Sequence, residues 1–295
     1  MSSLKKGFFQ KFAPDFGKNT PFFDKFLHFF AIGLGLLIIG TIGFYFSILL
    51  GLFGKVPDQA ELANIQDYNA SEIYSADGVL LGKYYIKNRT RVAYEDISPE
   101  LIKALVATED VRFYEHDGVD NRSLFRVIFK SILLGDQSAG GGSTISQQLA
   151  KNLYPRGSYS VLSMPVNKIK EILIAKKLEK IYSKEEILAL YLNTVSFGEN
   201  VFGIGAATQR FFSLTPDKIK LEEAAVLVGM LKATTYYNPR KNPERATSRR
   251  NTVLDQMARY EYLDPAKADS IKQLPLEIDY NNVTTSNGPA PYFRQ

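Results

Sequence analysis

An uncharged apolar run near the N-terminus constrains this chain more than any other feature. It occupies residues 29–53, and none of its 25 side chains is charged. At about 1.5 Å per residue, a helix of that length spans roughly 37 Å and so exceeds the ~30 Å hydrocarbon core of a bilayer. A buried core helix and a cleaved signal peptide are the alternatives. The run is long for a signal peptide and no clear cleavage pattern follows it, so we predict an uncleaved transmembrane helix.

The charges that flank this run predict its orientation. Residues 1–28 carry five lysines and two aspartates, a net charge of +3, which favours a cytoplasmic tail and an extracytoplasmic domain after the helix. The absence of cysteine fits an oxidising compartment and excludes disulfides, thiolate metal sites and a cysteine nucleophile. The only histidines are His28 and His116, which excludes a multi-histidine metal site. Acid–base chemistry must then depend mainly on carboxylates, lysines and tyrosines.

The rest of the chain has the pattern of a mainly α fold with one small β element. Residues 54–94 are expected to form a connector and a β-hairpin, because apolar and polar residues alternate around Asp77-Gly78. From Ser98 onward the periodicity is helical almost throughout. Ser98 is expected to cap a helix that begins with a proline, and Ser183 to form a capping box with the glutamate three positions later.

The first stretch with candidate catalytic residues is TEDVRFYEHDG, residues 108–118, at the end of a predicted helix. Glu109 and Phe113 share one helical face. A carboxylate at the C-terminal end of a helix works against the macrodipole, which suits a group that must accept and release a proton. A solvated charge cluster at a helix end is the alternative and, on these physical grounds alone, the commoner case.

The second stretch is GGGSTISQQLAKN, residues 140–152. Glycines let the backbone approach a ligand closely, and Ser143 is expected to cap a helix whose first N–H groups would bind an anion such as phosphate. Ser143, Gln147 and Lys151 recur every four residues, so one face would carry polar donors. No Gly-Lys-Ser/Thr follows the glycines, which excludes a Walker loop. A flexible loop followed by a capped helix would have the same pattern.

The third stretch is NKIKE, residues 167–171, within a strongly basic region. Lys168 and Glu171 are three residues apart on one helical face, and a carboxylate among cations should stay ionised. An ordinary exposed pair is the commoner alternative. Residues 122–180 carry ten cations against three anions, a net charge of +7, which indicates a cleft that attracts an anionic substrate. Nucleic acid is disfavoured as that substrate because the region is expected to face away from the cytoplasm.

Residues 122–135, RSLFRVIFKSILLG, combine a cationic stripe with apolar neighbours. Such a helix suits the boundary between lipid headgroups and acyl chains, and the apolar loop 159–166 could enter the same layer. A core helix with snorkelling cations is the alternative. The residues expected to face the lipid are Arg122, Phe125, Arg126, Phe129 and Lys130. Together with the basic region, they predict an anionic, lipid-borne substrate handled at the outer face of the membrane.

Five stretches resemble, in order and spacing, the five motifs of the family 51 peptidoglycan glycosyltransferases, which occur in class A penicillin-binding proteins and monofunctional transglycosylases. They are EDVRFYEHDG, GGSTISQQLAKN, NKIKE, ILALYLNTVSFGENVFGIGAAT and EEAAVLVGML, and the match covers about residues 90–265. The resemblance implies a lysozyme-like α fold over residues 95–270, with a head and a jaw of about residues 122–166. It also implies polymerisation of lipid II, in which the acceptor GlcNAc 4-hydroxyl attacks the donor MurNAc C1 and undecaprenyl pyrophosphate leaves.

The resemblance also implies roles for individual residues. Glu109 resembles the general base, and Glu171 resembles a second carboxylate that assists the pyrophosphate directly or through a divalent metal, Mg or Mn; no organic cofactor is implied. The positions similar to substrate-binding residues are Asp110, Phe113, His116, Ser143, Thr144, Gln147, Gln148, Lys151, Asn152, Arg156 and Lys168. The third motif usually begins Arg-Lys, whereas Asn167 precedes Lys168 here. A missing cation would weaken pyrophosphate binding unless Arg156 or Lys170 compensates.

The final residues, GPAPYFRQ, resemble the entry into the transpeptidase domain of class A penicillin-binding proteins. Lys-Thr-Gly does not occur, and Ser-x-x-Lys does not occur after the apolar run. We therefore expect the N-terminal portion of a longer bifunctional protein, with residues 271–295 as a linker. Expected partners are lipid II, the growing glycan strand, the membrane and other cell-wall synthesis proteins.

Two other functions remain open at this point. A lysozyme-like glycan hydrolase would share the paired carboxylates but would not need the lipid-facing jaw or the anion-binding loop. A non-catalytic membrane scaffold is the second alternative, and Asn167 is the residue that suggests it.

Overall fold

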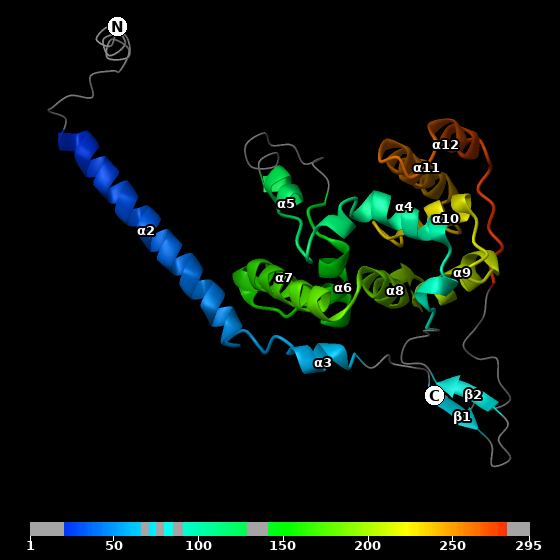
Figure 1. Ribbon diagram of the computed structural model, residues 1–295, viewed down its shortest axis with the longest axis horizontal. Helices are drawn as coiled ribbons and strands as arrows, with labels where there is room; N and C mark the ends of the chain where they lie inside the picture. The colour runs from blue at the N-terminus through cyan, green and yellow to red at the C-terminus, as the bar shows by residue number, and fades with distance from the viewer. Residues whose placement is uncertain (1–20, 66–70, 75–79, 85–90, 129–140, 282–295) are drawn as a thin grey trace, which may run out of the picture. The chain divides into compact units, whose positions relative to one another are not determined.

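The computed structural model describes residues 21–65, 71–74, 80–84, 91–128 and 141–281, and it divides into a unit of residues 1–55 and a unit of residues 56–295. In the first unit, helix α2 (Pro21–Leu49) is long and apolar enough to cross a membrane (Figure 1). The predicted helix is confirmed, but it ends at Leu49 rather than at residue 53. Gly51 has φ +80°, a left-handed conformation that interrupts an α-helix.

The second unit is mainly helical, which confirms the predicted fold class (Figure 1). Its helices are α3 (Gln59–Ala63), α4 (Pro99–Glu109), α5 (Asn121–Ile128), α6 (Ile145–Leu153), α7 (Ser163–Ile181), α8 (Lys184–Thr194), α9 (Ile204–Phe212), α10 (Leu221–Met230), α11 (Pro243–Arg259) and α12 (Pro265–Lys272). Short 3-10 turns occur at η1 (Tyr94–Asp96), η2 (Phe113–Glu115) and η4 (Ser160–Leu162).

Two antiparallel hairpins accompany the helices. Strands β1 (Ser71–Tyr74) and β2 (Leu80–Tyr84) pair as predicted, although the expected turn at Asp77-Gly78 lies outside the described residues. The pairing of β3 (Ser196–Gly198) with β4 (Val201–Phe202) was not predicted. Both residues of its turn, Glu199 and Asn200, have positive φ. Such two-residue turns usually contain Asn-Gly or Asp-Gly, so Glu-Asn gives a weak sequence signal.

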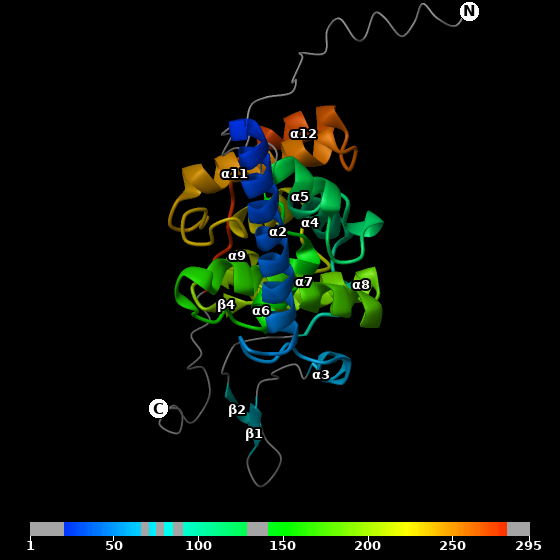
Figure 2. The ribbon, with the colours of Figure 1, turned by 90° about the vertical axis from the view of Figure 1, so that its left-hand side faces the viewer.

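The core brings the end of α4 to the start of α6. Helices α4, α10 and α11 pack against one another, and α10 is buried along most of its length. Helix α6 packs against both α7 and α8. In both views α4, α11 and α12 lie on one side of this unit and α6, α7 and α8 on the other (Figure 1 and Figure 2). The segment between α4 and α6 therefore joins the two groups of helices.

The predicted helix starts at Ser98 and Ser183 are confirmed, but of the three predicted caps only the one at Ser183 forms. Helix α4 begins after Ser98 as expected, although the serine hydroxyl makes no capping bond. Ser183 and Glu186 form the predicted capping box, with bonds of 3.2 and 2.7 Å. The expected cap at Ser143 is wrong, because the hydroxyl of Thr144 accepts the hydrogen bond from Gln147 N and caps α6 instead.

The C-terminal segment that we expected to be a linker is folded as far as the structure describes it. Ile271 lies within α12, and Leu276, Ile278 and Tyr280 pack against the core. These apolar residues alternate, whereas the Asn, Thr and Gly residues that suggested a linker are concentrated further on. Residues 282–295 lie outside the described part of the chain.

A buried arginine holds the start of this segment. Arg250 of α11 is 1% exposed, and its guanidinium donates to the carbonyls of Lys272 and Leu274 at 3.1 and 2.9 Å. Because these carbonyls belong to the last turn of α12 and the residues after it, the arginine supplies donors that the helix end lacks.

Candidate active site

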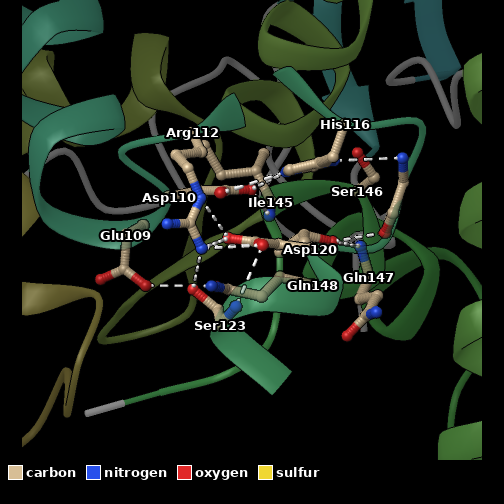
Figure 3. A network of polar contacts seen from close by, with 12 residues as sticks. Glu109, Asp110, Arg112, His116, Asp120, Ser123, Ile145, Ser146, Gln147 and Gln148 are labelled. Carbon is tan, nitrogen blue, oxygen red and sulfur yellow. Dashed lines mark hydrogen bonds and ion pairs between the residues drawn. The ribbon is translucent and has the colours of Figure 1, made fainter. Parts of the chain in front are cut away.

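Glu109 is the last residue of α4 and is partly exposed. Gln148 of α6 donates from Nε2 to Glu109 Oε2 at 2.9 Å (Figure 3). The other end of the same amide, Oε1, accepts from the hydroxyl of Tyr191 at 3.0 Å. Burial, and then the charge of Glu109, raise the pKa of Tyr191 well above its usual value, so the phenol keeps its proton. Glu109 is thus held through one carboxylate oxygen.

Asp110, the next residue, is buried and has a different environment (Figure 3). It accepts from the backbone N–H of Ile145 at 3.0 Å, so its carboxylate lies at the N-terminus of α6, where the helix dipole favours negative charge. It also lies 3.0 Å from His116 Nε2, while Gly118 N donates to His116 Nδ1 at 3.2 Å. The second bond makes Nδ1 the acceptor and assigns the hydrogen to Nε2. Asp110 therefore connects the end of α4 to the start of α6, and His116 holds the following loop against Asp110.

A neighbouring ion pair was not predicted from the sequence. Arg112 Nη2 lies 2.6 and 2.8 Å from the two carboxylate oxygens of Asp120 and also bonds to Ser123 (Figure 3). Burial opposes ionisation of Asp120, but hydrogen bonds from Ser123 and Arg112 outweigh it and lower the pKa to about 2. The two residues are eight positions apart, and the short η2 turn lies between them, so no helical spacing links them.

Phe113 is a core residue in this structure. Its side chain is fully buried, and its ring lies edge-on to His116 with centroids 6.2 Å apart. Lys184 of α8 places its ammonium 4.5 Å from the ring centroid and donates to the carbonyl of His116 at 2.6 Å. The aromatic side chain therefore supports the loop that carries His116.

A second cluster forms around Glu171 of α7, which is 6% exposed. Arg156 Nε donates to its Oε1 at 2.7 Å, and Lys168 Nζ lies 3.6 Å from Oε2. Lys168 also donates to Ser143 Oγ and Gln147 Oε1, both at 2.7 Å. Burial lowers the pKa of Lys168, although the charge of Glu171 opposes that shift. The structure thus brings together five residues that the sequence singled out.

Asn167 has a structural role that the sequence did not predict. Its side chain is buried and donates from Nδ2 to the carbonyls of Gly157 and Ser163 at 2.8 and 2.7 Å. Its Oδ1 accepts from Gly157 N at 3.0 Å. Asn167 therefore fixes the chain that follows Arg156. Of the two cations expected to compensate for the missing arginine, Arg156 contacts Glu171 whereas Lys170 bonds to Tyr159 OH at 3.2 Å.

The other predicted site residues lie around these two clusters. Thr144 is buried and donates to the carbonyl of Gly118 at 2.7 Å. In the last turn of α6, Asn152 is partly buried and Lys151 is exposed, and the charge of Lys151 adds to the lowering of the Lys168 pKa that burial dominates.

The described residues of the predicted lipid-facing set are exposed. Arg122, Phe125 and Arg126 lie on α5, and Phe125 is 70% exposed. Val161 and Met164, from the apolar loop and the first turn of α7, are 89% and 81% exposed. The predicted residues Phe129 and Lys130 lie outside the described part of the chain.

Two consecutive residues of α6 connect the clusters. Gln148 bonds to Glu109, and Gln147 bonds to Lys168 beside Glu171. A partly exposed carboxylate and a set of cations are thereby fixed to one short helix. Such an arrangement can accept a proton at one point and stabilise a developing anion at another.

Comparison with known proteins identifies the family. The family model described as Transglycosylase matches residues 77–258, a range that contains all five motifs. The chain belongs to the transglycosylase family. The predicted resemblance to the transglycosylase part of class A penicillin-binding proteins is confirmed, and so is the predicted enzyme class.

Relatives of this transglycosylase domain include penicillin-binding protein 1A of Escherichia coli (strain K12), 37% identical over 257 residues, which are 87% of this chain and 30% of the relative. Penicillin-binding protein 1A of Aquifex aeolicus is 36% identical over 83% of this chain and 34% of its own length. Penicillin-binding protein 1F of Bacillus subtilis is 36% identical over 78% and 31%. The chain thus spans about a third of the length of these relatives.

Among solved structures, the 2.6 Å crystal structure of penicillin-binding protein 1A from Haemophilus influenzae matches with 23% identity and a TM-score of 0.42. The match covers 74% of this chain and 22% of that one.

Proposed function

We propose that this transglycosylase domain is a peptidoglycan glycosyltransferase that polymerises lipid II at the outer face of the cytoplasmic membrane. The observation that carries the proposal is the pairing made by α6, in which Gln148 holds Glu109 and Gln147 holds Lys168 beside Glu171. A glycosyl transfer from a pyrophosphate donor needs a base for the acceptor hydroxyl and cations for the leaving group. The family supports the same reaction class.

The proposed step uses the two clusters at once. Glu109 accepts the proton of the acceptor GlcNAc 4-hydroxyl on Oε1, the oxygen to which no described residue donates a hydrogen bond. The hydroxyl oxygen forms a bond to the donor MurNAc C1 as the bond from C1 to the pyrophosphate oxygen breaks. That oxygen keeps the electron pair, and Lys168 and Arg156 stabilise the charge of the departing undecaprenyl pyrophosphate.

The resemblance left open whether Glu171 assists the pyrophosphate directly or through a divalent metal, and the residues around Glu171 do not fit the metal. One carboxylate oxygen lies 2.7 Å from Arg156 and the other 3.6 Å from Lys168, so a metal at this carboxylate would meet two cations. Among the described residues, no three His, Asp or Glu side chains gather in a way that would hold a metal ion. We therefore assign the leaving group to the cations and route no step through a metal.

Several features support a lipid-borne substrate. Helix α2 has the length and composition of a membrane span, and Phe125, Val161 and Met164 expose large apolar surfaces. The lysine-rich tail of residues 1–28 favours an N-terminus in the cytoplasm and a domain outside it. Because the substrate and the glycan product belong to the cell wall, we include other cell-wall synthesis proteins among the proposed partners.

The test is to incubate the purified, detergent-solubilised chain with labelled lipid II and to resolve the products by size. The wild type should form long glycan, and Glu109→Gln should reduce the rate by at least about 100-fold, since general-base catalysis is typically worth that much. Glu115→Gln is the matched control, because Glu115 is exposed and lies outside both clusters. Unreacted lipid II with the wild type would support a scaffold. Shortening of preformed glycan would support a hydrolase.

A further inference from the structure

A buried tyrosine of α8 contacts the side chain that holds Glu109 but has no part in the mechanism above. Tyr191 is 1% exposed, and its hydroxyl bonds to Gln148 Oε1 at 3.0 Å. Water has little access to this hydroxyl, so Gln148 is the partner that satisfies it. A buried hydroxyl without a partner costs free energy. Any movement of Gln148 that breaks this bond is therefore unfavourable.

The direction of the hydrogen bonds follows from the chemistry of each group. An ionised carboxylate only accepts, so the NH2 end of Gln148 must face Glu109 and the carbonyl end must face Tyr191. The tyrosine then donates, and burial keeps its proton in place by raising its pKa. The three side chains form a directed sequence from Tyr191 through Gln148 to Glu109.

A reversed amide would have the opposite effect on Glu109. The carbonyl oxygen of Gln148 would then face a carboxylate oxygen, and the two acceptors would repel each other. The carboxylate of Glu109 therefore decides which end of the amide faces it, and the Tyr191 hydroxyl holds the other end in place.

We propose that Tyr191 is a positioning residue for the base: it anchors the Gln148 amide, which holds Oε2 of Glu109 and leaves Oε1 for the acceptor proton. This inference rests on the proposed function, because it assigns a task to Glu109 in that reaction. It predicts that loss of one buried hydroxyl in α8 slows catalysis without weakening substrate binding.

The chain offers a matched control for this hydroxyl. Tyr182 OH donates to the carbonyl of Leu62 at 2.7 Å, away from both clusters. With labelled lipid II, Tyr191→Phe should lower kcat about tenfold and leave KM unchanged, whereas Tyr182→Phe should leave both unchanged. Equal kcat values for the two variants would overturn the inference, and so would a loss that appears only in KM.

A double-mutant cycle tests whether Tyr191 acts through Gln148. In the Gln148→Ala background, Tyr191→Phe should cause no further loss of kcat, and independent losses would contradict the proposal. If the wild type forms no glycan, the proposed function fails. The thermal unfolding midpoints of the same variants then test whether Tyr191 anchors Gln148: non-additive shifts would support this coupling, and additive shifts would overturn it.

Discussion

The family pattern and the structure predict opposite effects for the replacement of Asn167 by arginine. The third motif of the family usually begins Arg-Lys, so Asn167→Arg restores the usual residue and adds a cation near Glu171. In the structure, however, the Asn167 amide makes three bonds to the backbone of Gly157 and Ser163 and fixes the chain that follows Arg156. We expect the substitution to lower activity, because it releases the arginine that pairs with Glu171.

The magnitudes decide the sign of this prediction. Three hydrogen bonds at about 1 kcal/mol each give a loss of about 3 kcal/mol, before any penalty for the backbone groups left unpaired. A new ion pair at this buried position would recover little of that loss, because the cost of burying two charges can exceed their mutual attraction. The cost of the lost hydrogen bonds therefore outweighs the gain from the new ion pair. A loss of about 3 kcal/mol corresponds to a roughly 100-fold increase in opening of the segment that follows Arg156.

Hydrogen exchange measures the opening of the segment that follows Arg156, and lipid II polymerisation measures the loss of activity. The amide of Gly157, which donates to Asn167 Oδ1, should exchange about 100-fold faster in the variant, and kcat/KM should fall. Asn64→Arg, the same change at an exposed position, should alter neither. Wild-type or higher polymerisation by Asn167→Arg, with the Gly157 amide still protected, would refute the reasoning.

Three further predictions concern stability. The pKa of Asp120 falls from 3.8 to about 2 on folding, so its pairing with Arg112 stabilises the folded chain above about pH 4 and is lost as the pH falls toward 2. Asp120→Asn should therefore cost about 1–2 kcal/mol at pH 7 and almost nothing near pH 2 in denaturant titrations; a pH-independent cost would contradict this. Gly118 has φ +86°, and a Cβ there would lie 2.9 Å from the backbone of Ala175, so Gly118→Ala should lower the unfolding midpoint by more than a surface Gly→Ala change does. An unchanged midpoint would show that the loop adapts. Ser183→Ala removes half of a capping box and should cost about 1 kcal/mol, measured by chemical denaturation, with recovery expected for Ser183→Asp.

Sequence reasoning succeeded where the relevant residues are close in the chain. The pairing of Lys168 with Glu171 follows from helical spacing, and the capping box at Ser183 follows from a short pattern. The bond between Gln148 and Glu109 joins residues 39 positions apart, so it depends on how α4 and α6 pack. No local pattern contains that information.

Neighbouring residues of similar chemistry were harder to separate. Ser143 and Thr144 are both good cap residues, and tertiary contacts distinguish them: the Thr144 hydroxyl donates to the Gly118 carbonyl, whereas the Ser143 hydroxyl accepts from Lys168. The role of Asn167 has the same origin. Its amide can donate and accept, and this is useful only because Gly157 presents both an N–H and a carbonyl to it. A single position in a motif shows the charge that is missing but not the hydrogen bonds that replace it.

The buried guanidinium of Arg250 links the residues after α12 to α11, so we expect this part of the domain to unfold cooperatively. An arginine cannot release its proton, so separating residues 272–275 from α11 would leave a permanent charge inside the protein without its carbonyl partners. Fraying at the C-terminal end of α12 is therefore costly. We expect α11, α12 and the residues up to 275 to open as a single foldon. A shortened chain that stops before residue 275 would lose part of that unit, so a boundary chosen for expression belongs beyond it.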